Sequence, residues 1–152
     1  MNGSQQNLSG NANSGAPETL PRESLARGDN RRSGLVFLLD DDPSVLRSTG
    51  RLLDSQGWQV EGFTDPFAFL ARAAQVQPDV AVLDVLMPKL NGLEAQRRLR
   101  EVSPSTRVII LTSKDNPVVR ARALEAGASA FFLKATEQRE LLAGIEAAAA
   151  QI

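Results

Sequence analysis

The chain of 152 residues contains no cysteine and no histidine. Without cysteine it forms no disulfide, offers no thiolate nucleophile and builds no cysteine-based zinc site. Without histidine it supplies no histidine general base, no imidazole metal ligand and no phosphohistidine of its own. Any metal ion must therefore be held by oxygen atoms, which favours a hard cation such as Mg²⁺.

The sequence also lacks a strong charge imbalance and a long apolar run. The formal net charge is −1 and the pI is about 5.5, so electrostatics give no reason to expect direct binding to nucleic acid or to a membrane surface. No apolar run approaches the roughly 18 residues that a membrane helix needs, and residues 1–30 contain no apolar core of a signal peptide. We therefore expect a cytoplasmic protein.

Composition divides the chain into two parts. Residues 1–33 are rich in Asn, Ser, Gly and Gln, and their few apolar residues follow no period. Such a segment buries too little surface to offset the entropy of ordering, so we predict a disordered N-terminal tail. Residues 34–152 show regular apolar patterning and are predicted to form one folded domain.

Five short apolar runs in the folded part predict β-strands. They are Leu35–Leu39, Trp58–Phe63, Val80–Leu83, Val108–Leu111 and Ala130–Leu133. Four are nearly continuous in apolar residues, which is typical of parallel strands buried on both faces. The run at 58–63 carries Gln59 and Glu61 and is predicted to be an edge strand.

Helices are predicted between these runs from capping signals. Asp42, Asp65 and Asn116 each precede a proline, so each places a side-chain cap before a proline at the first helical position. Thr136 is predicted to cap a further helix. Gly57 and Gly127 stand where left-handed residues commonly end helices. Strands alternating with helices predict a doubly wound α/β fold.

Polar residues follow several of the predicted strands. Functional sites of open α/β sheets form at the carboxyl ends of the strands, where Asp40, Asp41, Asp84, Thr112 and Lys134 would converge if those strands are neighbours. Crowded carboxylates repel one another unless a cation neutralises them. A carboxylate beside Mg²⁺ can attack phosphorus, and a lysine and a hydroxyl group can stabilise the phosphoryl oxygens.

The folded part resembles the receiver domain of bacterial two-component response regulators over residues 34–151. Five motifs in order carry the resemblance: Leu39-Asp40-Asp41-Asp42-Pro43, Asp84-Val85-Leu86-Met87-Pro88 with Gly92, Leu111-Thr112-Ser113, Ala126-Gly127-Ala128 and Phe132-Leu133-Lys134. The resemblance implies a flavodoxin-like three-layer sandwich with five helices around a five-stranded parallel sheet of order 2-1-3-4-5.

The resemblance also implies roles for individual residues. Asp84 would be the phosphoacceptor. Mg²⁺ would be bound by Asp41, Asp84 and the backbone carbonyl of Leu86, and by Asp40 through water. Lys134 would pair with the phosphoryl group. The set describes a self-phosphorylating switch with slow autodephosphorylation, and not a metabolic enzyme.

The same resemblance implies how the signal would spread and to whom. Thr112 would move toward the phosphoryl group, and Phe131, at the aromatic switch position, would turn inward. The surface formed by the fourth helix, the fifth strand and the fifth helix would then change. The phosphodonor would be a sensor histidine kinase or a histidine phosphotransfer protein. The output would be a downstream effector protein, an effector domain absent from this chain, or a phosphorylation-dependent dimer.

The chain departs from the family pattern in two places: at Ala135, and at Leu86 and Lys114, which stand two residues after Asp84 and Thr112 and would influence how water reaches the phosphoryl group. Ala135 follows Lys134 where most members have proline, so we predict a trans peptide bond there. Leu86 cannot hydrogen-bond an attacking water, so we predict slow loss of the phosphoryl group. Two other functions remain as alternatives, an interaction module without a switch and a flavin-binding domain. The aspartates after the first strand would repel a phosphate that lacks a metal ion, which argues against flavin.

Overall fold

Five apolar segments of the chain form parallel strands, and a helix follows each strand. The computed structural model describes residues 34–151, so the tail predicted over residues 1–33 lies outside the described part. The elements in chain order are β2 (Leu35–Leu39), α1 (Pro43–Ser55), β3 (Gln59–Phe63), α2 (Pro66–Val76), β4 (Val80–Leu83), α3 (Gly92–Val102), β5 (Arg107–Thr112), α4 (Pro117–Glu125), β6 (Ala130–Leu133) and α5 (Gln138–Ala149).

The strands form one parallel sheet of order β3-β2-β4-β5-β6. In chain order this is 2-1-3-4-5, so the predicted flavodoxin-like topology is confirmed. Strand β3 lies at one edge, and its residues are exposed or only partly buried, as its polar residues indicated. The central strand β4 is buried along its whole length. Because all five strands run in the same direction, their carboxyl ends lie together along the same boundary of the sheet, across the strand direction.

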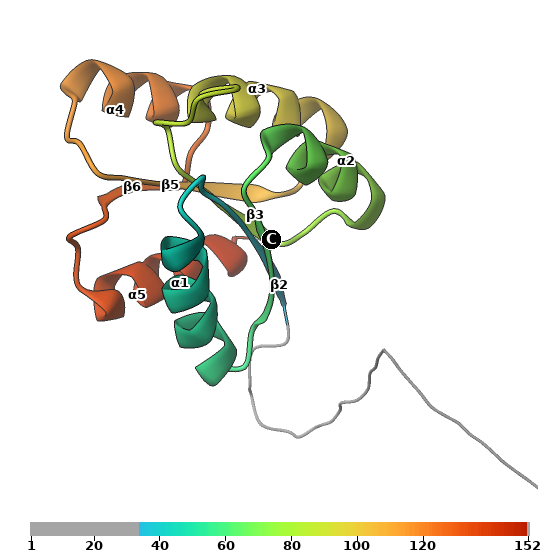
Figure 1. Cartoon of the computed structure of the whole chain (residues 1–152), viewed down its shortest axis with the longest axis vertical. Coiled ribbons are helices and arrows are strands. Elements are labelled where there is room, and N and C mark those ends of the chain that lie inside the picture. The colour runs from blue at the N-terminus through green and yellow to red at the C-terminus, as the bar shows by residue number, and fades with distance from the viewer. Residues whose placement is uncertain (1–33, 152) are drawn as a thin grey trace, which may run out of the picture. The chain divides into compact units, whose positions relative to one another are not determined.

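Successive residues of the strands serve two separate hydrophobic cores because their side chains alternate between the faces of the sheet. Phe37, Leu39 and Ile110 belong to the core beneath α2, α3 and α4. Val36 and Ile109 belong to the core beneath α1 and α5. Figure 1 shows the resulting three layers, with α1 and α5 on one face and the other three helices on the opposite face. Within residues 34–151, none of these helices combines the length and the apolar character needed to cross a bilayer.

Three of the predicted helix caps are confirmed. The carboxylate of Asp42 accepts a hydrogen bond from the backbone N–H of Ser44 at 2.9 Å, at the start of α1. Asp65 at α2 and Asn116 at α4 cap their helices in the same way. Each cap accepts a hydrogen bond from at least one of the N–H groups that a helix N-terminus leaves unpaired, and such a cap typically contributes about 1 kcal/mol. Gly57 and Gly127 have the predicted left-handed conformation.

The predicted cap at Thr136 is wrong. Helix α5 begins at Gln138, its N-cap residue is Glu137, and no side chain caps it. The backbone N–H of Thr136 instead donates to the carbonyl of Leu133 at 2.9 Å. Thr136 therefore belongs to the turn by which the chain leaves β6. The threonine followed by Glu137 resembles a cap and does not reveal that a turn separates β6 from α5.

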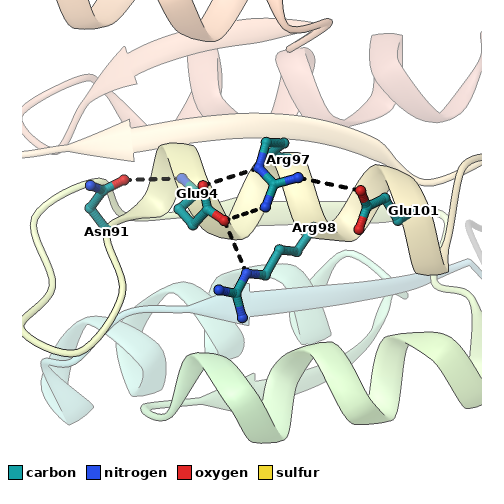
Figure 2. A network of polar contacts seen from close by, with 5 residues as sticks. All are labelled: Asn91, Glu94, Arg97, Arg98 and Glu101. Carbon is teal, nitrogen blue, oxygen red and sulfur yellow. Dashed lines mark hydrogen bonds and ion pairs between the residues drawn. The ribbon is translucent and has the colours of Figure 1, made fainter.

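A polar network covers the exposed side of α3 (Figure 2). Asn91 caps the helix by accepting a hydrogen bond from the backbone N–H of Glu94 at 3.0 Å. The Glu94 carboxylate accepts hydrogen bonds from Arg97 and from Arg98, and Arg97 also pairs with Glu101. Hydrogen bonds from Arg97 and Arg98 lower the pKa of Glu94 to about 2. The negative charge also lies near the positive end of the helix dipole, so the network holds the first turn of α3.

Replacing Glu94 with Gln is expected to remove part of the acid sensitivity of folding. The folded pKa of about 2 lies below the reference value of 4.5, so the unfolded chain binds the proton more readily. The stabilisation is therefore present above about pH 4.5 and is lost as pH falls toward 2. Denaturant unfolding between pH 3 and pH 6 should show a shallower pH slope in Glu94→Gln. Glu146→Gln, on the exposed side of α5, is the matched control, and an equal change in both variants would contradict the assignment.

Candidate functional site

The register of the two central strands places two aspartates side by side. Leu39 of β2 pairs with Leu83 of β4, so Asp40 and Asp84 follow at the same level of the sheet. The backbone N–H of Asp84 donates to the carbonyl of Leu39 at 2.9 Å. Both aspartates are only 4% exposed, whereas Asp41 is exposed. Carboxylate oxygens of all three lie within 4.8 Å of one another.

Lys134 reaches this cluster from the end of β6, which is the edge strand opposite β3. Thr112 of β5 pairs with Leu133 of β6, and the backbone N–H of Lys134 donates to the carbonyl of Thr112 at 2.8 Å. The ammonium Nζ lies 2.7 Å from Oδ2 of Asp40 and 3.3 Å from Oδ2 of Asp84. The closer contact with Asp40 was not predicted, because sequence spacing does not fix the direction of a long side chain.

Electrostatics at the site favour a further positive charge. Burial raises the pKa of Asp84, and the nearby Asp40 charge adds to this, against the backbone N–H of Leu86 and the charge of Lys134. Burial acts to lower the pKa of Lys134, but the hydrogen bonds and charges of Asp40 and Asp84 outweigh it and the pKa is raised. Lys134 therefore stays protonated and pairs with Asp40 and Asp84, while the carboxylate of Asp41 lies beside these two.

The residues present fit a magnesium ion. Their ligand atoms are carboxylate oxygens, which Mg²⁺ prefers, and their negative charge is only partly compensated. Two backbone contacts fix the buried carboxylates. The N–H of Leu86 donates to Oδ1 of Asp84 at 3.2 Å, and the N–H of Asp42 donates to Oδ1 of Asp40 at 2.9 Å. Asp42 thus has a second contact besides its predicted capping role, and no sequence signal indicated it.

The two predicted switch residues lie on β5 and β6. Thr112 ends β5 and is 2% exposed, next to the strand end that carries Lys134. Phe131 lies inside β6 and packs in the core beneath α4, with 6% of its surface exposed. The guanidinium of Arg120 on α4 lies 5.0 Å from the centre of the Phe131 ring. Phe131 is therefore buried in the core, on the strand that leads to Lys134.

The peptide bond after Lys134 is trans, as predicted from Ala135. Every peptide bond among the described residues 34–151 is trans. The position of Lys134 is set by β6 and by the hydrogen bond from its backbone N–H to the carbonyl of Thr112. The ammonium thus reaches Asp40 and Asp84 without a proline after Lys134.

Comparisons with known proteins agree with this geometry. The sequence pattern of the response regulator receiver domain matches residues 36–146. The chain is 33% identical over 132 residues to the response regulator protein TodT of Pseudomonas putida, covering 87% of this chain and 58% of TodT. It is 38% identical over 112 residues to the response regulator MprA of Mycobacterium leprae, covering 74% of this chain and 49% of MprA. The chain spans about half the length of the curated relatives it matches.

Solved structures show the same arrangement of elements. A CheY-like response regulator receiver domain protein from Methanospirillum hungatei superimposes with a TM-score of 0.75 at 25% identity, over 79% of this chain and 96% of that chain. A LuxR-family two-component response regulator from an Aurantimonas species superimposes with a TM-score of 0.74 at 30% identity, over 79% and 87% of the two chains.

Proposed function

Because the chain belongs to the response regulator receiver domain family, we propose that it is a phosphorylation switch that accepts a phosphoryl group on Asp84 in the presence of Mg²⁺. The observation that carries the proposal is the convergence of Asp40, Asp41, Asp84 and Lys134 at one edge of the sheet. The phosphodonor would be a sensor histidine kinase or a histidine phosphotransfer protein in the cytoplasm. Such a domain is a signalling switch and not a metabolic enzyme.

The proposed reaction begins at the Asp84 carboxylate. A carboxylate oxygen of Asp84 forms a bond to phosphorus while the P–N bond of the donor's phosphohistidine breaks. The imidazole nitrogen keeps the electron pair and later takes a proton from solvent. Lys134 is poised to stabilise the phosphoryl oxygens, since its ammonium already lies 3.3 Å from Asp84. Asp41, Asp84 and the Leu86 carbonyl would hold Mg²⁺, with Asp40 acting through water, and the bound ion would supply positive charge to the phosphoryl oxygens.

Signalling would follow from a change of partners at the strand ends. A phosphoryl group on Asp84 would attract Lys134 away from Asp40 and offer oxygen acceptors to the Thr112 hydroxyl. The backbone bond between Thr112 and Lys134 links β5 to β6, and Phe131 lies on β6. We propose that these shifts alter the surface of α4, β6 and α5. That surface would contact an effector protein, an effector domain in a longer chain, or a second copy in a phosphorylation-dependent dimer.

Acetyl phosphate tests the proposed function without a kinase. Incubation with acetyl phosphate and Mg²⁺ should raise the mass of the protein by one phosphoryl group. Omitting Mg²⁺ or adding a chelator should prevent the gain. A protein that binds Mg²⁺ but gains no mass with acetyl phosphate or with a phosphorylated histidine phosphotransfer protein would favour the alternative of an interaction module without a switch.

Leu86 is expected to prolong the phosphorylated state. Its side chain is 48% exposed two residues after Asp84, so it lies on the solvent side of the acceptor and cannot hydrogen-bond an attacking water. Leu86→Asn should shorten the lifetime of the phosphorylated protein several-fold, which is well below the roughly 10²–10⁴-fold contribution of a positioned general acid or base. The decay of the phosphorylated mass after removal of acetyl phosphate measures this lifetime. Leu86→Met is the apolar control, and an unchanged or longer lifetime in Leu86→Asn would contradict the role.

A further inference from the structure

Gly92 lies in close contact with the backbone of the proposed phosphoacceptor. It is the first residue of α3, it is buried, and its N–H donates to the carbonyl of Val85 at 3.0 Å. A Cβ atom at this position would lie 2.3 Å from the carbonyl oxygen of Asp84 and 2.8 Å from Cα of Val85. Carbon and oxygen atoms in ordinary contact lie more than 3 Å apart, so no side chain fits here without a shift of backbone.

The two segments that meet at Gly92 are both firmly held, so a side chain there cannot be accommodated cheaply. On one side, Asp84 follows the buried strand β4, and its backbone N–H donates a hydrogen bond to the carbonyl of Leu39 on the neighbouring strand. On the other side, α3 buries Ala95 and Leu99 in the core, and Asn91 caps its first turn. Figure 2 shows the polar network that continues from this cap along the helix. The contact therefore fixes the distance between α3 and the Asp84 segment.

We propose that Gly92 is a positioning residue for the site. Its missing side chain lets the first turn of α3 support the backbone of Asp84 and Val85, which sets the direction of the Asp84 carboxylate and of the Leu86 carbonyl. The inference rests on the proposed function for its consequence in phosphorylation, but not for its consequence in Mg²⁺ binding. Because a displacement of about 1 Å at a reacting group can cost roughly 10²-fold in rate, the contact affects chemistry although Gly92 touches neither substrate nor metal.

Gly92→Ala tests this role against a matched control. Gly50→Ala also replaces a helical glycine, but its Cβ would lie 3.8 Å from Val60, which is an ordinary contact. Both changes favour helix formation, so propensity alone predicts equal or higher stability for both. We expect Gly92→Ala to bind Mg²⁺ at least about 10-fold more weakly by calorimetry, and to accept phosphate from acetyl phosphate about 10–100-fold more slowly at saturating Mg²⁺. Gly50→Ala should match the wild type within about twofold.

A metal-free measurement separates positioning from general loss of structure. The N–H of Leu86, which donates to Oδ1 of Asp84, should exchange with solvent faster in Gly92→Ala, while amides in the middle of β4 and β5 keep their protection. If Gly92→Ala does not fold, Asn91→Ala loosens the same turn and should weaken Mg²⁺ binding about threefold, in line with the loss of a helix cap.

The outcomes for the two proposals are distinguishable. Mg²⁺ affinity and Leu86 exchange within twofold of the Gly50→Ala control would overturn the role of Gly92. So would wild-type Mg²⁺ affinity in Asn91→Ala when Gly92→Ala is unfolded. Failure of the wild-type protein to accept phosphate would overturn the proposed function, while the Mg²⁺ and exchange measurements would still decide whether Gly92 positions the acidic site.

Discussion

Asp84→Asn is expected to abolish acceptance of a phosphoryl group and to stabilise the metal-free fold. An amide oxygen is too weak a nucleophile to attack phosphorus, so the mass gain with acetyl phosphate and Mg²⁺ should fall below detection. The same change removes a buried charge. Burial and the Asp40 carboxylate raise the pKa of Asp84, which means that its ionised form is disfavoured in the folded state. Mass spectrometry and denaturant unfolding without Mg²⁺ measure the two effects.

The matched control for this prediction is Asp79→Asn at the opposite end of the sheet. Asp79 directly precedes β4, at the amino end of the sheet, and its carboxylate accepts a hydrogen bond from the backbone N–H of Leu35. Its replacement should lower stability, because the charged acceptor of that hydrogen bond is lost, and should leave the phosphoryl gain intact. A phosphorylated Asp84→Asn protein would show that another residue accepts the group.

Lys134→Met is expected to destabilise the metal-free protein by about 2–4 kcal/mol. Removing one partner of a buried ion pair typically costs about 3–5 kcal/mol, and the Lys134 side chain is 24% exposed, which reduces the loss. The cost arises because Asp40 and Asp84 are left facing each other without a compensating charge. Mg²⁺ should therefore raise the melting temperature of Lys134→Met by more than it raises that of the wild type.

Two further variants separate this effect from a general loss of surface charge. Lys89→Met breaks an exposed pair with Asp65 at 3.7 Å and should change stability by less than about 1 kcal/mol. The double variant Lys134→Met with Asp84→Asn should recover much of the loss, because Asp40 is then the one buried carboxylate of the site without a compensating charge. Equal stability of Lys134→Met and wild type without Mg²⁺, or no recovery in the double variant, would contradict the electrostatic description of the site.

The sheet was predictable from sequence because buried parallel strands and capped helices leave local signals. Apolar runs located all five strands within about one residue, and Asx-Pro pairs at 42–43, 65–66 and 116–117 located three helix starts. The start of α5 was misplaced by the cap predicted at Thr136, since no side chain caps that helix. Residues at a helix start without a cap carry no local signal that distinguishes turn from helix.

The composition of the site was predictable, but its contacts were not. A residue that directly follows a parallel strand lies at the carboxyl end of the sheet, so Asp40, Asp84 and Lys134 were expected to lie together there. The preference of Lys134 for Asp40 depends on rotamers and on the register between strands distant in sequence. The close approach of Gly92 to Asp84 depends on how α3 packs, which no spacing in the sequence specifies. Buried Gln96, which donates to the carbonyl of Ala123 on α4, was likewise not anticipated.

Locating the phosphoryl group tests the central claim most directly. After reaction with acetyl phosphate and Mg²⁺, borohydride reduces an acyl phosphate to an alcohol, which converts the modified aspartate to homoserine. Peptide mapping then identifies the residue. We predict homoserine at position 84 alone, and none when Mg²⁺ is omitted. Homoserine at position 40 or 41, or a phosphoryl group that survives borohydride on a serine or threonine, would contradict the assignment of Asp84 as the phosphoacceptor.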